Sequence, residues 1–248
     1  MKAFIIFEMD LGNLKRIKSF LGLALIVGFY HYLWVFDAPL SVIYDTVSGQ
    51  KATTVIDFEN WKVLDFEELP QSEQFKYENP TCKSFSYTDS KFLKITWFDR
   101  YKNITGTTKA YQLLTPDRLI GNRIRIPNLS KTQYLLMDKK VLEIYQNLLQ
   151  ELLKKGFETD RIRITSALRN PTYNLMVNGA SCSQHQLGTA LDISVGDING
   201  DGASDYKDRA EVYSILEYKL VKNDGGIGKY PNSPKLIHFD TRGKRARW

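Results

Sequence analysis

A long uncharged apolar stretch lies near the N-terminus. Residues 20–36 read FLGLALIVGFYHYLWVF, and three basic residues stand just before them at 15–18. Seventeen residues are at the short end of what spans a bilayer, and basic residues ahead of a span keep that side in the cytoplasm. We therefore expect a cytoplasmic tail at 1–19, a single uncleaved membrane anchor at 20–40, and export of the rest. The alternative is a cleaved signal peptide, although no small-x-small cleavage site follows.

Short runs that alternate apolar and polar residues fill the next part of the chain. Strands are expected at 53–58 (TTVIDF), 91–98 (KFLKITWF), 110–114 (AYQLL) and 122–127 (NRIRIP). None of these runs carries a catalytic motif. The pattern predicts that 41–127 form a β-rich region that spaces the next domain or packs against it.

The pattern changes to longer helices near the middle of the chain. Ser130 and Gln133 have the spacing of a capping box, and apolar residues recur at three- and four-residue intervals over 141–152. We expect a helix of about six turns, which Gly156 ends.

Further elements follow at regular intervals. Strands are predicted at 161–168, 189–195 and 235–240; helices are predicted after the Asn170–Pro171 pair, ending at Gly179, and over 209–222; Gly225, Gly226 and Gly228 are expected to form a flexible turn. Residues 128–248 are thus predicted to be an α+β domain of ordinary size.

Composition narrows the class of protein. Hydrophobic residues make up 43% of the chain and aromatic residues 12%, which excludes a disordered, collagen-like or multi-span membrane chain. The net charge of +6 suits an anionic surface such as a cell wall or a membrane, and we expect no nucleic-acid partner. Three histidines and two cysteines exclude zinc-finger arrays and disulfide-dense scaffolds.

Two histidines outside the apolar stretch each lie near a carboxylate. His185 precedes Asp192 in SQHQLGTALD, and His238 precedes Asp240 in HFD. A catalytic zinc needs three protein ligands and one open position, and two histidines with a carboxylate are a standard set. Gly188 lets the chain turn so that His185 and Asp192 can face one ion. The alternative is a pair of hydrogen-bonded core histidines.

These residues carry a resemblance to a known family. Ser-x-His-x-x-Gly-x-Ala-x-Asp at 183–192, followed by His-x-Asp at 238–240, resembles the zinc D-Ala-D-Ala carboxypeptidases and endopeptidases, the VanY-like and LAS-type peptidases. The resemblance covers about 128–248, and the terminal GGIGKYP, IHFD and RARW resemble a bacterial murein-peptidase branch. It implies the α+β fold shared with the hedgehog signalling domain, in which helices pack on a small antiparallel sheet.

The resemblance also implies roles for single residues. Zinc would be held by His185, Asp192 and His238. Arg169 falls on the family's arginine in ITSALRNPTYN, where it would bind a substrate carboxylate or polarise a carbonyl, and Ser183 would bind substrate.

The sequence offers one candidate for the general base. Several relatives have an acid or a histidine a few residues before the last zinc ligand, whereas 231–237 read PNSPKLI. Asp240 is the nearest candidate for this catalytic task, and its other role would be to orient His238.

The expected function is a zinc metallopeptidase anchored in the bacterial inner membrane, with its catalytic domain in the periplasm or on the outer face. It would cut peptide bonds that contain D-amino acids in peptidoglycan stem peptides, as a D,D-carboxypeptidase or a murein endopeptidase. One alternative is a metal-bearing module that binds the wall or a protein without catalysis. Another is a lysozyme-like hydrolase with paired carboxylates and no metal.

A second ion site is predicted beside the first. Calcium-loop positions 1, 3, 5, 7, 9 and 12 are occupied by Asp197, Asn199, Asp201, Ala203, Asp205 and Asp208, with Gly202 at position 6. The alternative is an acidic surface turn in which Asp205 caps the next helix. Cys82 and Cys182 can form one disulfide or stay unpaired, because the sequence gives no distance between them.

Overall fold

The computed structural model describes residues 58–78, 80, 82–116, 118–120, 124–126 and 131–248. The predicted cytoplasmic tail and membrane anchor at 1–40 lie outside these residues. Across the described part of the chain, no helix is long and apolar enough to cross a membrane.

Short strands and a few helices make up the described residues. The strands are β1 (Val63–Asp65), β2 (Lys91–Ile95), β3 (Asn103–Thr105), β4 (Thr108–Lys109), β5 (Arg118–Ile120), β6 (Ile124–Ile126), β7 (Gln133–Leu135), β8 (Ile162–Ser166), β9 (Ala190–Val195), β10 (Gly226–Lys229), β11 (Leu236–Asp240) and β12 (Ala246–Arg247). The α-helices are α3 (Gln71–Gln74), α4 (Lys139–Lys154), α5 (Pro171–Met176) and α6 (Tyr206–Ile215), which a π-helical turn continues over Leu216–Leu220.

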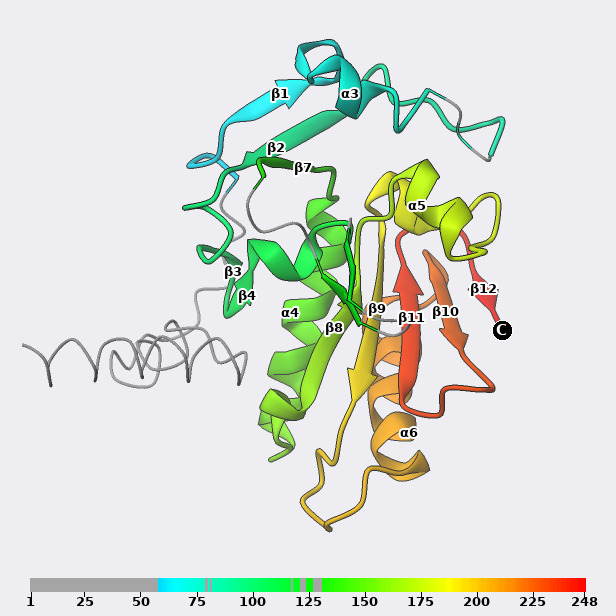
Figure 1. Ribbon diagram of the computed structural model, residues 1–248. Helices are drawn as coiled ribbons and strands as arrows, with labels where there is room; N and C mark the ends of the chain where they lie inside the picture. The colour runs from blue at the N-terminus through cyan, green and yellow to red at the C-terminus, as the bar shows by residue number, and fades with distance from the viewer. Residues whose placement is uncertain (1–57, 79, 81, 117, 121–123, 127–130) are drawn as a thin grey trace, which may run out of the picture. The chain divides into compact units, whose positions relative to one another are not determined.

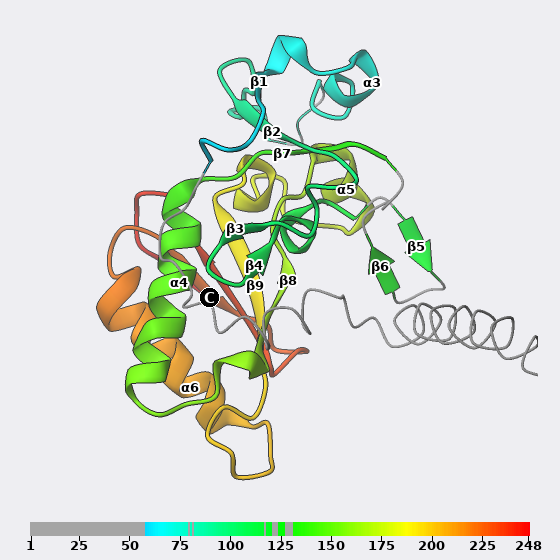
Figure 2. The ribbon, with the colours of Figure 1, turned by 90° about the vertical axis from the view of Figure 1, so that its left-hand side faces the viewer.

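The largest sheet has the order β12-β10-β11-β9-β8. Its neighbours are antiparallel except β10 and β12, which run parallel. Helices α4 and α6 lie side by side over one face of this sheet (Figures 1 and 2). A smaller sheet has the order β1-β2-β7, and β3–β4 and β5–β6 form two hairpins. This mixed architecture agrees with the predicted α+β class, and the expected antiparallel sheet gains one parallel edge strand.

Helix α4 begins later than its sequence pattern predicted. Asp138 is its N-cap and accepts a hydrogen bond from the Lys140 amide at 3.0 Å, whereas Gln133 lies in strand β7. The capping-box prediction was therefore wrong, and Ser130 lies outside the described residues. The end was correct, because Gly156 follows the C-cap with a φ of 83°.

One strand prediction in the β-rich region was wrong. Ala110–Leu113 form a 3-10 helix, in which the buried Ala110 and Leu113 have the three-residue spacing of that helix rather than the alternation of a strand. The expected strand at 91–98 is confirmed as the shorter β2, and part of 122–127 as β6. Most of 53–58 lies outside the described residues.

The strands and helices predicted after residue 160 are mostly confirmed. They appear as β8, β9, α5, α6 and β11, with Asn170 capping α5 through the Tyr173 amide and Asp205 capping α6. The flexible glycine turn was wrong, because Gly226–Lys229 is strand β10. A Cβ on Gly226 would lie 2.3 Å from Asp240 Oδ2, so this glycine is needed for close approach rather than for flexibility.

One hydrophobic core joins the β-rich region to the helices and the large sheet. Leu93, Ile104 and Leu113 are buried in the same cluster as Leu148 of α4 and Phe239 of β11. The described residues accordingly group as one unit. A second, aromatic cluster lies under the smaller sheet and contains Leu64, Leu69, Tyr77, Tyr87 and Phe92.

Candidate metal centre

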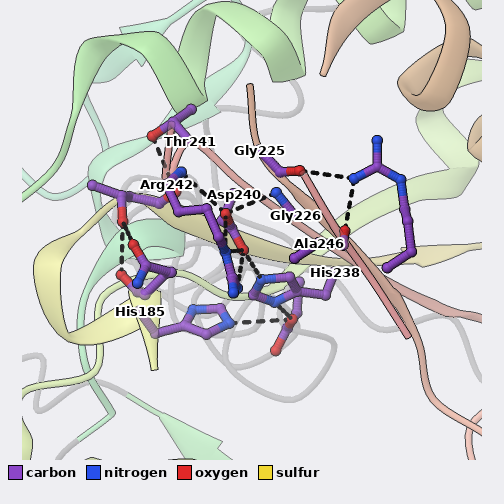
Figure 3. A network of polar contacts seen from close by, with 12 residues as sticks. His185, Gly225, Gly226, His238, Asp240, Thr241, Arg242 and Ala246 are labelled. Carbon is purple, nitrogen blue, oxygen red and sulfur yellow. Dashed lines mark hydrogen bonds and ion pairs between the residues drawn. The ribbon is translucent and has the colours of Figure 1, made fainter. Parts of the chain in front are cut away.

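Three predicted ligands meet on one face of the large sheet. Asp192 of β9 pairs directly with His238 of β11, so their side chains point to the same side. His185 comes from the 3-10 helix Gln184–Leu187, which Gly188 ends in the left-handed conformation with a φ of 66°. A donor atom from each of the three lies within 4.8 Å of the others, and all three residues are buried. Figure 3 shows the imidazoles of His185 and His238 close together.

The hydrogen bonds of His185 leave one nitrogen free for a metal. Its Nδ1 lies 2.6 Å from the Ala167 carbonyl oxygen, which can only accept, so Nδ1 carries the proton. Its Nε2 is buried without a hydrogen-bond partner and lies 3.2 Å from Asp192 Oδ1. Burial also lowers the pKa of His185 and keeps the ring neutral. A buried neutral nitrogen facing a carboxylate fits a zinc ligand.

His238 approaches Asp192 Oδ1 through Nδ1, whereas His185 approaches it through Nε2. Its Nδ1 lies 2.9 Å from Asp192 Oδ1, and its Nε2 lies 3.0 Å from Asp240 Oδ2. Burial acts to lower the pKa of His238, but the hydrogen bonds to the two carboxylates outweigh burial and raise it. For Asp192, burial acts to raise the pKa, while His185, His238 and Arg169 hold it well below its usual range.

Asp240 lies on the far side of His238 from the metal cluster and is fully buried. Its carboxylate accepts hydrogen bonds from the Gly226 amide at 2.9 Å and from Arg242 Nη2 at 2.6 Å, as Figure 3 shows. Asp240 does not line the cavity next to the cluster. This position suits an orienting partner of His238 better than a base that meets substrate.

Arg169 contacts the cluster directly. Its Nη2 donates to Asp192 Oδ2, its Nε donates to Ser166 Oγ at 2.8 Å, and its backbone amide donates to the His185 carbonyl at 3.0 Å. The ion pair of Arg169 is therefore with a predicted zinc ligand and not with the acidic loop near Asp197.

A cavity of about 970 Å³ opens beside the cluster. Its walls include Arg169, Ser183, Tyr230 and Trp248, so Ser183 lies where substrate could reach it. Tyr230 was not singled out from the sequence, although its hydroxyl donates to Asp192 Oδ1 at 3.0 Å. The GGIGKYP run that contains it was used for its glycines and for the family resemblance, and its tyrosine was given no role.

The predicted calcium loop is stabilised by its own hydrogen bonds. Asp197 accepts from the amides of Gly200 and Gly202 at 2.8 Å, and Asp205 caps α6. Asp208 Oδ1 accepts from the Ile198 amide at 2.9 Å and Oδ2 from the Asp205 amide at 2.9 Å.

The position-12 carboxylate should turn both oxygens to a calcium ion, but Asp208 is buried and its oxygens are used by the backbone. The Asn199 side-chain amide donates a hydrogen bond to Asp201 Oδ2, and the Ala203 backbone amide donates one to Asp201 Oδ1. Among the residues that the structure describes, three metal-ligating side chains converge only at His185, Asp192 and His238. The calcium prediction is therefore not supported.

The two cysteines form a disulfide, with their Cα atoms 4.7 Å apart. Cys182 lines the cavity and stands three residues before His185. The bond thus ties the β-rich region to the loop that leads into the metal cluster.

The comparisons with known proteins agree with this geometry. Residues 130–240 match the family model described as Peptidase M15. No match was found among curated proteins or among solved structures. The matched residues contain all three predicted ligands, and peptidases of this family depend on zinc. Residues 130–240 are thus similar to the M15 zinc metallopeptidases, and the His185–Asp192–His238 cluster lies within the matched part of the chain.

Proposed function

We propose that this protein hydrolyses peptide bonds containing D-amino acids in peptidoglycan stem peptides, as a D,D-carboxypeptidase or a murein endopeptidase. The observation that carries the proposal is the buried cluster of His185, Asp192 and His238, with Arg169 beside it, at the wall of a large cavity. The family match makes peptide hydrolysis the activity that fits this cluster best. The predicted anchor and the basic net charge fit an exported protein that works at an anionic wall.

The residues of the site fall into zinc ligands and residues that orient them. His185 through Nε2, His238 through Nδ1 and Asp192 through Oδ1 would hold the zinc ion. When bound, zinc supplies a Lewis acid that polarises a peptide carbonyl and lowers the pKa of a water molecule. Asp240 fixes the His238 ring, and Arg169 fixes Asp192 while its planar guanidinium faces the cavity, where it can meet a substrate oxygen.

A second function is favoured by one observation. Among the described residues that line the cavity, Asp192 is the only carboxylate, and Arg169, His238 and Tyr230 already bond it. A module that holds zinc and binds stem peptides without cutting them would need no free base.

The test uses the full-length zinc-loaded chain in mild detergent with defined dimeric muropeptides. Loss of one terminal D-Ala by mass spectrometry would identify a carboxypeptidase, and separation of the two stems an endopeptidase. His185→Ala serves as the metal-free control. Binding of muropeptides without new products would favour the non-catalytic module, and glycan cleavage that survives chelation would favour a lysozyme-like hydrolase.

A further inference from the structure

The metal cluster has a hydroxyl neighbour that the family resemblance did not assign. Tyr230 follows strand β10, and its hydroxyl donates to Asp192 Oδ1 at 3.0 Å. The same oxygen lies 2.9 Å from His238 Nδ1 and 3.2 Å from His185 Nε2. The phenol therefore reaches the point on which all three predicted ligands converge.

Hydrogen bonds fix the backbone at Tyr230, and the bond to Asp192 holds its phenol. The Lys229 amide donates to the Trp248 carbonyl at 2.8 Å, and the Ser233 amide donates to the Tyr230 carbonyl at 3.0 Å. The backbone is thus hydrogen-bonded at the residue before Tyr230 and at Tyr230 itself. A donor that is already in place loses little freedom when it meets a reacting group.

The cavity also needs a donor of this kind. Asp240 lies behind His238, and Asp192 is occupied by its own contacts, so neither carboxylate faces an incoming peptide freely. Arg169 approaches Asp192 through the other oxygen, Oδ2. A peptide oxygen next to the cluster would therefore find Arg169 near one oxygen of Asp192 and Tyr230 near the other.

We propose that Tyr230 is a catalytic residue whose hydroxyl turns its one proton from Asp192 Oδ1 to the carbonyl oxygen of the scissile peptide as that oxygen gains negative charge. In this step a water oxygen bonds to the carbonyl carbon and the π electron pair moves onto the carbonyl oxygen. When the pair returns, the C–N bond breaks and the amine leaves with a proton from the water. Tyr230 keeps its own proton throughout. The inference rests on the proposed function in that the site must receive a peptide carbonyl.

The test compares zinc-loaded wild type with Tyr230→Phe, which removes only the hydroxyl. Tyr218→Phe is the matched control, because Tyr218 is exposed on the π-helical turn after α6. Zinc content and thermal stability are measured first on each protein. Calorimetry then gives the affinity for acetohydroxamate, a small anion that chelates zinc through two oxygens, and hydrolysis of muropeptides is measured in parallel.

We expect Tyr230→Phe to keep a full equivalent of zinc, to bind acetohydroxamate about 10-fold or more weakly, and to lose on the order of 10²-fold in kcat. Tyr218→Phe should match wild type in every measurement. Equal acetohydroxamate affinity in wild type and Tyr230→Phe would overturn the inference, and so would a wild type that does not bind the anion. If the anion distinguishes the two proteins while wild type cuts no muropeptide, the inference stands and the proposed substrate fails.

Discussion

Replacing Asp240 by Asn tests whether Asp240 acts as a general base or only orients His238. Asp240 Oδ1 accepts from the Gly226 amide and from Arg242, while Oδ2 accepts from His238 Nε2 at 3.0 Å and from Arg242 Nη2. If the Asn side-chain oxygen keeps the hydrogen bonds of Oδ1, its NH₂ group takes the place of Oδ2 and faces two donors, His238 Nε2 and Arg242 Nη2. His238 can then bond the new NH₂ only by moving its own proton to Nδ1, the nitrogen that faces the metal cluster.

This proton shift gives the size of the expected effect. A ligand with its proton on the coordinating nitrogen must lose that proton before it binds, and loss of a partner of this kind typically costs 10- to 100-fold in metal affinity. That corresponds to about 1.4–2.7 kcal/mol. Arg242 also loses a carboxylate partner, and because its side chain is 25% exposed we expect a smaller loss than for a fully buried pair, about 2 kcal/mol of unfolding free energy.

Zinc affinity would be measured by competition with a chelator, and unfolding free energy by denaturant titration. Asp224→Asn is the control, because Asp224 is exposed just before β10. Hydrolysis is then compared at saturating zinc, where we expect Asp240→Asn to recover much of its activity. Unchanged zinc affinity combined with lost hydrolysis would show that Asp240 moves a proton in catalysis, and the reasoning from its buried position would be wrong.

Three further changes test the rest of the site. Arg169→Lys should keep zinc but lower kcat/KM on the order of 10²-fold, because a point charge cannot bond Asp192 and a substrate oxygen in one plane; unchanged turnover would remove Arg169 from the site. His185→Ala should lose tightly bound zinc, measured by metal analysis after dialysis, and retention of a full equivalent would refute its assignment as a ligand. The double substitution of Cys82 and Cys182 by Ser should lower the unfolding free energy by about 2–5 kcal/mol, since the bond closes a loop of sequence separation 100; denaturation curves that match wild type would show that the crosslink adds no stability.

The metal cluster was predictable because its signals are local. Gly188, three residues after His185, adopts the left-handed conformation that turns the chain towards Asp192. Asp192 lies in a strand that the apolar residues around it predicted. Register then placed His238 directly opposite Asp192. These residues could be predicted as ligands before the strand register was known, because the two short motifs at 183–192 and 238–240 leave few candidate ligands.

Contacts between distant strands were not predictable in this way. Nothing near Tyr230 or Arg242 in the sequence shows that their side chains reach Asp192 and Asp240. Gly226 was interpreted as part of a flexible turn, because glycine is uncommon inside strands, and only the carboxylate lying against it explains its presence. The calcium prediction failed for the opposite reason. The sequence of the acidic loop matches the calcium-loop pattern, but its last carboxylate, Asp208, points inward and accepts hydrogen bonds from backbone amides.

The shared core limits how much of this chain can be removed. The family match spans 130–240, but strand β7 at 133–135 takes its partner β2 from outside that range, and Trp248 beside His238 lies beyond its other end. A gene fragment limited to the matched residues would leave Leu135 without its neighbours Leu93 and Ile95. The stretch that the family model matches is therefore shorter than the stretch whose strands and side chains pack together, and a chimaera that grafts this metal centre onto another protein would have to carry the flanking strands with it.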